Sequence, residues 1–164
     1  MSNLFQDLHY DPETGNFTWK RAGNNRISVG QTAGHLNLCG YIKITIGRRQ
    51  YAAHRLAWLA IYGTWPNKLI DHINGDRSDN RIVNLRLATA AQNIQNARSY
   101  ARKTPNGLKG TSYDPRSGKW YAVVTVDKRR LHLGTFATSE DANAAYCAAA
   151  KQHFGQFFNA GKAT

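Results

Sequence analysis

Cysteine is scarce in this chain of 164 residues. Cys39 and Cys147 are its two examples, and they lie far apart, with no C-x-x-C pair. A disulfide framework needs more cysteines than this, and a structural zinc site needs them at closer spacing. We therefore expect both thiols to be reduced and partly buried, and we expect no structural zinc.

Long apolar runs are also missing. No stretch approaches the ~20 consecutive apolar residues that cross a bilayer as a helix. The N-terminal residues MSNLFQDLHYDPETG lack the basic start and the apolar middle of a secretory signal. These absences predict a soluble protein of the cytoplasm with no membrane partner, long enough for one medium domain or two small ones.

Acidic residues are few: 10 Asp and Glu face 22 Lys and Arg, which gives a net charge of +12. This imbalance favours a polyanionic partner, because basic side chains that neutralise phosphates release condensed counterions. A basic surface kept for solubility is the alternative, and the charge alone does not exclude it. A lipid surface is less favoured, since no long basic amphipathic helix is evident.

The sequence divides near a basic, turn-rich stretch. Residues 97–108 read ARSYARKTPNGL, with few apolar side chains, which is typical of a linker. We therefore predict two domains, residues 1–97 and 109–164, joined by a basic linker at 98–108. Both domains are basic, so we expect both to contact the same partner.

Short strands and one helix are predicted in the first domain. NFTW, YIKITI and QYAAH alternate or use β-branched and aromatic residues, with a turn at IGRRQ, and predict antiparallel strands. RLAWLAIYG has apolar residues at helical spacing and stops at Gly63. His54, at this strand-to-helix junction, is expected to be a satisfied structural hydrogen-bonding residue.

The second domain has a clear strand pattern. WYAVVTV alternates between two faces, DKRR makes a turn, and RLHLG continues with Leu131 and Leu133 on the buried side. KGTSYD predicts a preceding strand, and Ser139 is expected to cap a helix that ends near Gly155. Small alanines in that helix let it lie close on the sheet, which leaves the other face of the sheet free.

The order and spacing of these elements resemble the ethylene-response-factor type of DNA-binding domain. The resemblance covers residues 109–155 and includes the W-x-A strand, the LGTF turn and the helix with A-x-x-A-Y-x-x-A-A before FG. By position it implies a set of DNA-contacting residues on or beside the free sheet face. They are Lys109, Arg116, Lys119, Tyr121, Thr125, Arg130 and His132.

Residues 69–93, LIDHINGDRSDNRIVNLRLATAAQN, concentrate polar side chains of another kind. LID predicts a short strand that ends in Asp71, with His72 directly after it. Phosphodiester hydrolysis needs a base with a near-neutral pKa and a hard cation, for which histidine and aspartate are suited. Asn84 and Asn93 follow at intervals of 12 and 9 residues, and Thr89 is a good N-cap for a helix that carries Asn93.

Two structural interpretations compete with that chemistry. Asp-His followed by Asn-Gly-Asp is also a common polar turn, and the two asparagines are also common helix caps. A calcium loop of the EF-hand type fits less well, because the alternating ligands and the terminal Glu are missing.

The intervals resemble the HNH nuclease motif in its ββα-metal form, and HRLAWLAIYG, DHINGD, DNR, NLR and QN resemble the phage and intron homing endonucleases. The resemblance implies that His72 is the general base, that Asp71 and Asn93 bind Mg²⁺ or Mn²⁺, and that Asn84 and Arg86 complete the catalytic set. Asn84 would tie the loop between the strands, and Arg86 would bind a phosphate. The third signature residue is Asn93 rather than histidine, as in the nicking branch of these enzymes.

The two resemblances together predict an α+β fold. It has an N-terminal ββα-metal HNH nuclease domain with extra antiparallel strands, followed by a C-terminal three-stranded antiparallel sheet packed on one helix.

The predicted function is a site-selective, metal-dependent DNA endonuclease of the homing type, acting in a bacterial cell that hosts a phage. Its partner would be double-stranded DNA, its products 5′-phosphate and 3′-hydroxyl ends, and its oligomeric state a monomer or a homodimer. One such site makes one cut, so nicking and double-strand cleavage both stay open. A non-catalytic DNA-binding regulator is the alternative, and an RNA-binding protein is less favoured because outward Arg and Thr suit a duplex major groove.

Overall fold

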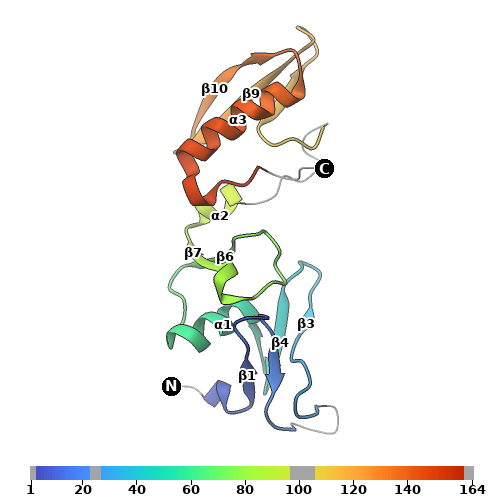
Figure 1. Ribbon diagram of the computed structural model, residues 1–164, viewed down its shortest axis with the longest axis vertical. Coiled ribbons are helices and arrows are strands. Elements are labelled where there is room, and N and C mark those ends of the chain that lie inside the picture. The colour runs from blue at the N-terminus through green and yellow to red at the C-terminus, as the bar shows by residue number, and fades with distance from the viewer. Residues whose placement is uncertain (1–2, 23–26, 97–105, 161–164) are drawn as a thin grey trace. The chain divides into compact units, whose positions relative to one another are not determined.

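The computed structural model of the protein describes residues 3–22, 27–96 and 106–160. The chain forms two compact units, Met1–Ala90 and Ala91–Thr164 (Figure 1). Each unit has its own hydrophobic core. Helices and small antiparallel sheets occur together, as predicted. The predicted linker falls largely on residues 97–105, outside the described part of the chain. No helix within the described part has the length and apolarity that a membrane crossing requires.

Within its described residues, the first unit has three small antiparallel sheets and helix α1. Strand β1 pairs with β2, β3–β4–β5 form a three-stranded sheet, and β6 pairs with β7. The bounds are β1 Leu8–Tyr10, β2 Phe17–Trp19, β3 His35–Leu36, β4 Ile42–Ile46, β5 Arg49–Ala52, α1 Ala53–Tyr62, β6 Leu69–His72 and β7 Leu85–Ala88, with 3₁₀ turns η1 Asn3–Phe5 and η2 Ile82–Asn84.

The predicted β4–β5 hairpin and helix α1 are confirmed. The hairpin turns at residues 47–48, with Ile46 paired to Arg49. Helix α1 begins two residues before the predicted RLAWLAIYG stretch, at Ala53. It ends at Gly63, whose φ of 70° gives the left-handed C-cap that glycine adopts without steric cost.

Apolar side chains from all three sheets and α1 meet in one core. Leu8, Phe17 and Leu56 are at most 2% exposed, and Ile70 of β6 and Leu85 of β7 belong to the same cluster. Burial of such side chains contributes roughly 1.5–3 kcal/mol each. The β6–β7 hairpin, which carries the Asp-His pair, is therefore anchored to the core of the first unit.

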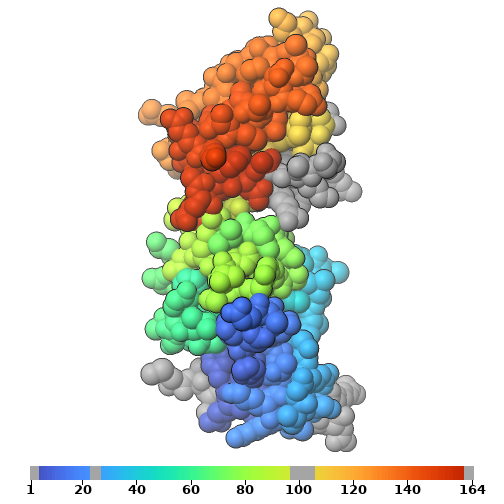
Figure 2. All heavy atoms as spheres, viewed as in Figure 1, coloured from blue at the N-terminus to red at the C-terminus, as the bar shows by residue number. Residues whose placement is uncertain are grey.

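The turn between β1 and β2 packs directly on the loop that precedes β7. Gly15 there has a φ of +74°, and a Cβ at this position would overlap the backbone of Asn80 and Arg81. The hydroxyl of Tyr10 donates a hydrogen bond of 2.8 Å to the carbonyl oxygen of Asn80. Figure 2 shows the blue atoms of the N-terminal region directly against the green atoms of the loop.

The second unit is a three-stranded antiparallel sheet with helix α3 on one face. Strand β9 is central, between β10 and β8. Ala142, Tyr146 and Ala150 of α3 form a core with Ala122 and Val124 of β9. The bounds are α2 Ala90–Asn96, β8 Thr111–Asp114, β9 Lys119–Val126, β10 Arg129–Phe136, α3 Ser139–Phe154 and the 3₁₀ turn η3 Gly155–Phe157.

Two details of the second unit differ from the predictions. Leu131 lies opposite Val124 yet is 40% exposed, because β10 is an edge strand and has a neighbouring strand on one side only. Leu133 does pack against the core. Thr138, rather than Ser139, is the N-cap of α3, and its hydroxyl accepts a hydrogen bond of 3.1 Å from the backbone N–H of Asp141.

Replacing Gly15 with alanine is expected to lower the free energy of unfolding by more than backbone strain alone. A left-handed backbone costs a residue with a Cβ about 1–2 kcal/mol, and overlap with a packed neighbour adds about 1–3 kcal/mol. Gly30→Ala is the matched control, because Gly30 has a similar φ of +81° and a Cβ there would meet no atom of the described residues within 4 Å. Urea denaturation followed by tryptophan fluorescence measures both variants, and equal losses would contradict the packing of this turn on the loop.

Candidate active site

Asp71 and His72 end strand β6, and both are buried, at 4% exposure each. Across the hairpin, Asp71 faces Arg86 and His72 faces Leu85. Successive side chains of a strand point to opposite faces. The carboxylate and the imidazole therefore leave β6 in opposite directions.

The Asp71 carboxylate forms a buried ion pair with Arg86. The Nε and Nη2 atoms of Arg86 lie 2.9 and 2.7 Å from Oδ2 of Asp71, and the side chains are 11% and 5% exposed. Removing one partner of such a pair costs about 3–5 kcal/mol, because the other charge stays buried. The arginine predicted to bind a phosphate thus neutralises and orients Asp71 in this structure.

Residues 73–84 form a loop between β6 and β7, here called the 73–84 loop, and the side chain of Asn84 closes it. Its Oδ1 accepts a hydrogen bond of 3.0 Å from the backbone N–H of Asn74. Its Nδ2 donates one of 2.8 Å to the carbonyl oxygen of Asp79. One buried carboxamide therefore joins the start of the loop to its middle.

Short polar contacts hold the rest of the loop. Asn74 donates a side-chain hydrogen bond of 2.8 Å to Asp79, which also forms an ion pair of 2.7 Å with Arg81. The hydrogen bond from Arg81 is the main cause that lowers the pKa of Asp79 to about 2. Asp76 accepts hydrogen bonds from the backbone N–H and the hydroxyl of Ser78. Carboxylates that stay charged at neutral pH therefore help Asn84 to hold the loop in its closed form.

The imidazole of His72 contacts an amide and two rings. Its Nε2 lies 3.3 Å from Oδ1 of Asn80, a side chain that is 3% exposed. The rings of His54 and Tyr41 have centroids 5.2 and 6.0 Å from that of His72. Burial lowers the pKa of His72 below its ordinary value of 6.5, and the Asn80 hydrogen bond and the charge of Asp71 oppose that shift. A neutral imidazole can accept a proton at physiological pH, as a general base must.

His54 is not the satisfied structural histidine that the sequence predicted. It lies in the first turn of α1, and its buried Nδ1 has no hydrogen-bond partner among the described residues. Burial lowers the pKa of His54 to about 3, and the positive charges of His72, Arg55 and Lys43 act in the same direction. The neutral ring, which also lies 5.3 Å from Tyr41, therefore serves as an aromatic wall beside His72.

The donors near β6 suit a hard cation that binds together with its substrate. Within the described residues, no group of three or more His, Cys, Asp and Glu side chains could hold a metal ion. Asp71 supplies one carboxylate, and Mg²⁺ often uses one or two carboxylates with several waters and substrate phosphates. Such a sparse oxygen set fits Mg²⁺ or Mn²⁺ and does not fit a tetrahedral zinc cage. The other predicted ligand, Asn93, is half-buried in α2, which belongs to the second unit.

The second unit gathers most of the predicted DNA-contacting residues on the sheet face opposite α3. Thr125 pairs with Arg130 across β9 and β10, and the ring of Tyr121 stacks on His132 with centroids 6.0 Å apart. Lys119 begins β9, with its side chain exposed. Arg116 lies in the exposed turn between β8 and β9.

Lys109 lies apart from that face. Its Nζ donates hydrogen bonds of 2.6 Å to the carbonyl oxygen of Gln95 and 3.4 Å to that of Asn159. Burial lowers the pKa of Lys109. Its ammonium group joins α2 to the C-terminal segment of the second unit, which is a structural role.

The sequence patterns missed Asn80 and Tyr41. Asn80 is one of several polar residues in DRSDNR, and Tyr41 was counted as a strand residue. Periodicity and spacing carry no signal for either contact with His72, because both depend on how the loop and the strand fold toward each other.

Residues 51–95, from β5 into α2, match the model of a family described as HNH endonuclease. The matched segment contains β6, the 73–84 loop and β7. A curated relative, Protein 3.8 of Escherichia phage T7, is 33% identical to the chain over 78 residues, which is 47% of this chain. The match spans 64% of the length of that relative. The predicted HNH resemblance is confirmed for this segment, and the resemblance of residues 109–155 to ethylene-response factors stays a prediction.

Acidification should destabilise the protein through His54. Between its folded pKa of about 3 and the unfolded value of 6.5, the unfolded chain binds a proton on this ring that the folded protein excludes. The free energy of unfolding therefore decreases as the pH is lowered through this window, by roughly 1 kcal/mol per pH unit. His54→Phe keeps a ring beside His72 and should show a shallower loss between pH 6.5 and 4 in urea denaturation. The exposed His35 gives a control, His35→Phe, and a wild-type slope in His54→Phe would contradict the burial of this imidazole.

Proposed function

We propose that the protein is a site-selective DNA endonuclease of the homing type, which hydrolyses phosphodiester bonds with the help of a divalent cation. The single observation that carries the proposal is the buried Asp71–His72 pair at the end of β6, beside a loop closed by Asn84. This arrangement lies in the segment that matches the HNH endonuclease family. The phage relative is consistent with a protein that acts in an infected bacterial cell.

In this proposal His72 is the catalytic base. Its neutral imidazole accepts a proton from the water that attacks phosphorus. Asn84 keeps the hairpin and its loop in one arrangement, and Arg86 holds the Asp71 carboxylate in a fixed orientation. The products are a 5′-phosphate and a 3′-hydroxyl end.

Asp71 and Asn93 are the proposed ligands of Mg²⁺ or Mn²⁺. A bound cation of this kind stabilises the negative charge that develops on the leaving oxygen. The ion pair with Arg86 offsets the charge of Asp71, so we expect weak cation affinity in the absence of DNA.

The exposed sheet face of the second unit is the proposed binding surface for double-stranded DNA. Basic and polar side chains from adjacent strands form a surface that suits the major groove. Its members are Arg116, Lys119, Tyr121, Thr125, Arg130 and His132, whereas Lys109 is omitted because its ammonium group binds carbonyl oxygens of the unit itself. The protein would work as a monomer that nicks or as a homodimer that cuts both strands.

His72→Ala is expected to remove most cleavage of supercoiled plasmid in Mg²⁺, by at least about 100-fold, because a general base contributes roughly 10²–10⁴-fold. DNA binding in EDTA, measured by fluorescence anisotropy, should stay near the wild-type level. His132→Ala is the control for losing an imidazole outside the proposed catalytic site, and it should affect binding rather than the cleavage rate at saturating DNA.

Asp71 requires a conservative substitution, because alanine would leave Arg86 buried without its partner. Asp71→Asn keeps an oxygen acceptor toward Arg86 and should abolish cation-dependent cleavage while circular dichroism shows a folded protein. Full cleavage by Asp71→Asn or His72→Ala would defeat the assignment of the site. Binding of DNA by the wild-type protein with no cleavage in any divalent cation would favour a non-catalytic regulator.

Arg130→Ala is expected to weaken duplex binding and to reduce the slope of log affinity against log salt by about 1. Lys151→Ala is the matched control, because it removes the same charge from an exposed site on α3, which covers the other face of the sheet. Anisotropy titrations across a salt series measure both variants. Equal effects of the two substitutions would show that the sheet face is not the DNA-contacting surface.

A further inference from the structure

Contacts to the backbone and to the side chain of Asn80 hold this residue in place. The hydroxyl of Tyr10 binds its carbonyl oxygen, and Gly15 packs against its backbone from the β1–β2 turn. Its side-chain Nδ2 donates a hydrogen bond of 3.0 Å to the carbonyl oxygen of Ser78. The residue is 3% exposed, so its carboxamide has a fixed position beside His72.

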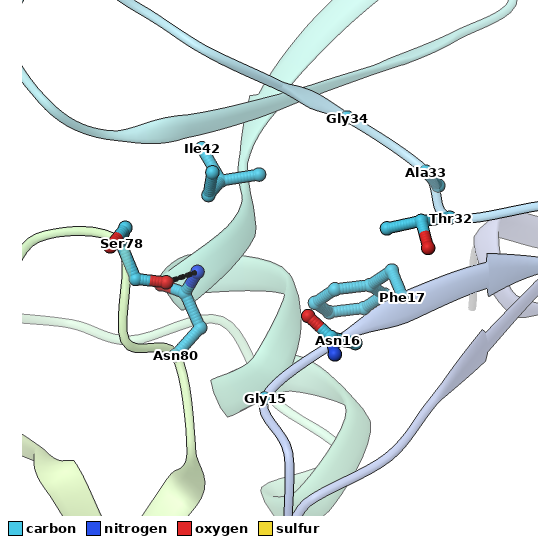
Figure 3. A pocket seen from close by; sticks show the side chains of 9 residues that line it. All are labelled: Gly15, Asn16, Phe17, Thr32, Ala33, Gly34, Ile42, Ser78 and Asn80. Carbon is cyan, nitrogen blue, oxygen red and sulfur yellow. Dashed lines mark hydrogen bonds between the residues drawn. The ribbon is translucent and has the colours of Figure 1, made fainter.

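The Ser78 carbonyl decides which end of the Asn80 amide faces His72. A carbonyl oxygen accepts hydrogen bonds and cannot donate them. If the amide were reversed, Oδ1 would face the Ser78 carbonyl, and two acceptor oxygens would repel each other. Nδ2 therefore points to Ser78, as Figure 3 shows by its dashed line, and Oδ1 points to His72.

The orientation of Asn80 in turn decides which nitrogen of His72 carries the proton. In a neutral imidazole one ring nitrogen is a donor and the other bears the lone pair, and the hydrogen bond of one nitrogen sets the state of the other. Oδ1 of Asn80 is an acceptor 3.3 Å from Nε2, so Nε2 is the N–H donor. The lone pair then belongs to Nδ1.

We propose that Asn80 is the positioning residue that fixes the Nε2–H tautomer of His72 and so makes Nδ1 the atom that deprotonates the attacking water. This inference rests on the proposed endonuclease function. The water loses a proton to Nδ1, and its oxygen forms the new bond to phosphorus. The P–O3′ bond breaks with its electron pair on the 3′ oxygen, which takes a proton from solvent.

Asn80 also forms part of the wall of a cavity of about 290 Å³. Asn16, Thr32, Ile42 and Ser78 line the same cavity, and Figure 3 shows their side chains around it. The cavity gives a matched control for the role of Asn80. Asn16 presents the same carboxamide group to this space, but its side chain makes no contact with His72 in the described structure.

The tautomer is directly measurable by long-range ¹H–¹⁵N correlation spectra of the full-length protein at pH 8, with the His72 signals assigned by their loss in His72→Gln. We expect Nε2 to resonate as a protonated ring nitrogen and Nδ1 as an unprotonated one. Asn80→Leu should give a mixture of tautomers, whereas Asn16→Ala should keep the wild-type pattern. An Nδ1–H ring in the wild-type protein, or an unchanged pattern in Asn80→Leu, would overturn the proposal.

Cleavage kinetics give the second readout. Asn80→Leu should lower kcat by about 10- to 100-fold, the loss that follows when the partner that orients a metal-binding histidine is removed, with little change in KM. Asn16→Ala should cleave like the wild-type protein. Loss of kcat in Asn16→Ala equal to that in Asn80→Leu would overturn the positioning role. A wild-type protein that never cleaves DNA would instead defeat the proposed function, and the spectra would still decide whether Asn80 fixes the tautomer.

Discussion

The carboxamide of Asn84 is the interaction on which the arrangement of the site depends. By joining Asn74 to Asp79 it closes the 73–84 loop, and only a closed loop brings Asn80 back to the imidazole of His72. The amide is buried, so its hydrogen bonds are costly to lose, at about 1–3 kcal/mol for each group left unsatisfied. The side chain of Asn84 therefore contributes both to the geometry of the site and to the stability of the fold.

The first unit maintains a set of buried polar groups that a core built for stability alone would not contain. Asp71, His72, Asn80 and Asn84 are all at most 6% exposed, and each has polar contacts within the hairpin and its loop. Burying such groups is tolerated only when their partners are supplied. The N-terminal turn contributes through Gly15, which lets the β1–β2 connection support the loop from outside. A region distant in sequence thus helps to hold the residue that contacts the proposed base.

Local patterns were sufficient to predict several strands and the C-terminal ends of α1 and α3. Alternation located β4, β5, β9 and β10, and Gly63 marked the end of α1. The intervals after His72 led to the HNH segment that the family match confirms. The partners of the site were not predictable in the same way. The Asp71–Arg86 ion pair depends on strand register, and the Asn80 contact depends on loop closure. Burial of Leu131 failed as a prediction because its strand lies at an edge, which no local pattern reports.

The central claim is that one imidazole, held at the end of β6, performs the proton transfer of DNA cleavage. Chemical rescue tests it most directly. In His72→Gly the ring is replaced by a void in a buried site, and added imidazole can occupy that void as a free base. We predict that His72→Gly is inactive on plasmid DNA in Mg²⁺ and that imidazole restores cleavage in a concentration-dependent manner, with no such effect on Asp71→Asn. Cleavage by His72→Gly at the wild-type rate without imidazole would contradict the account.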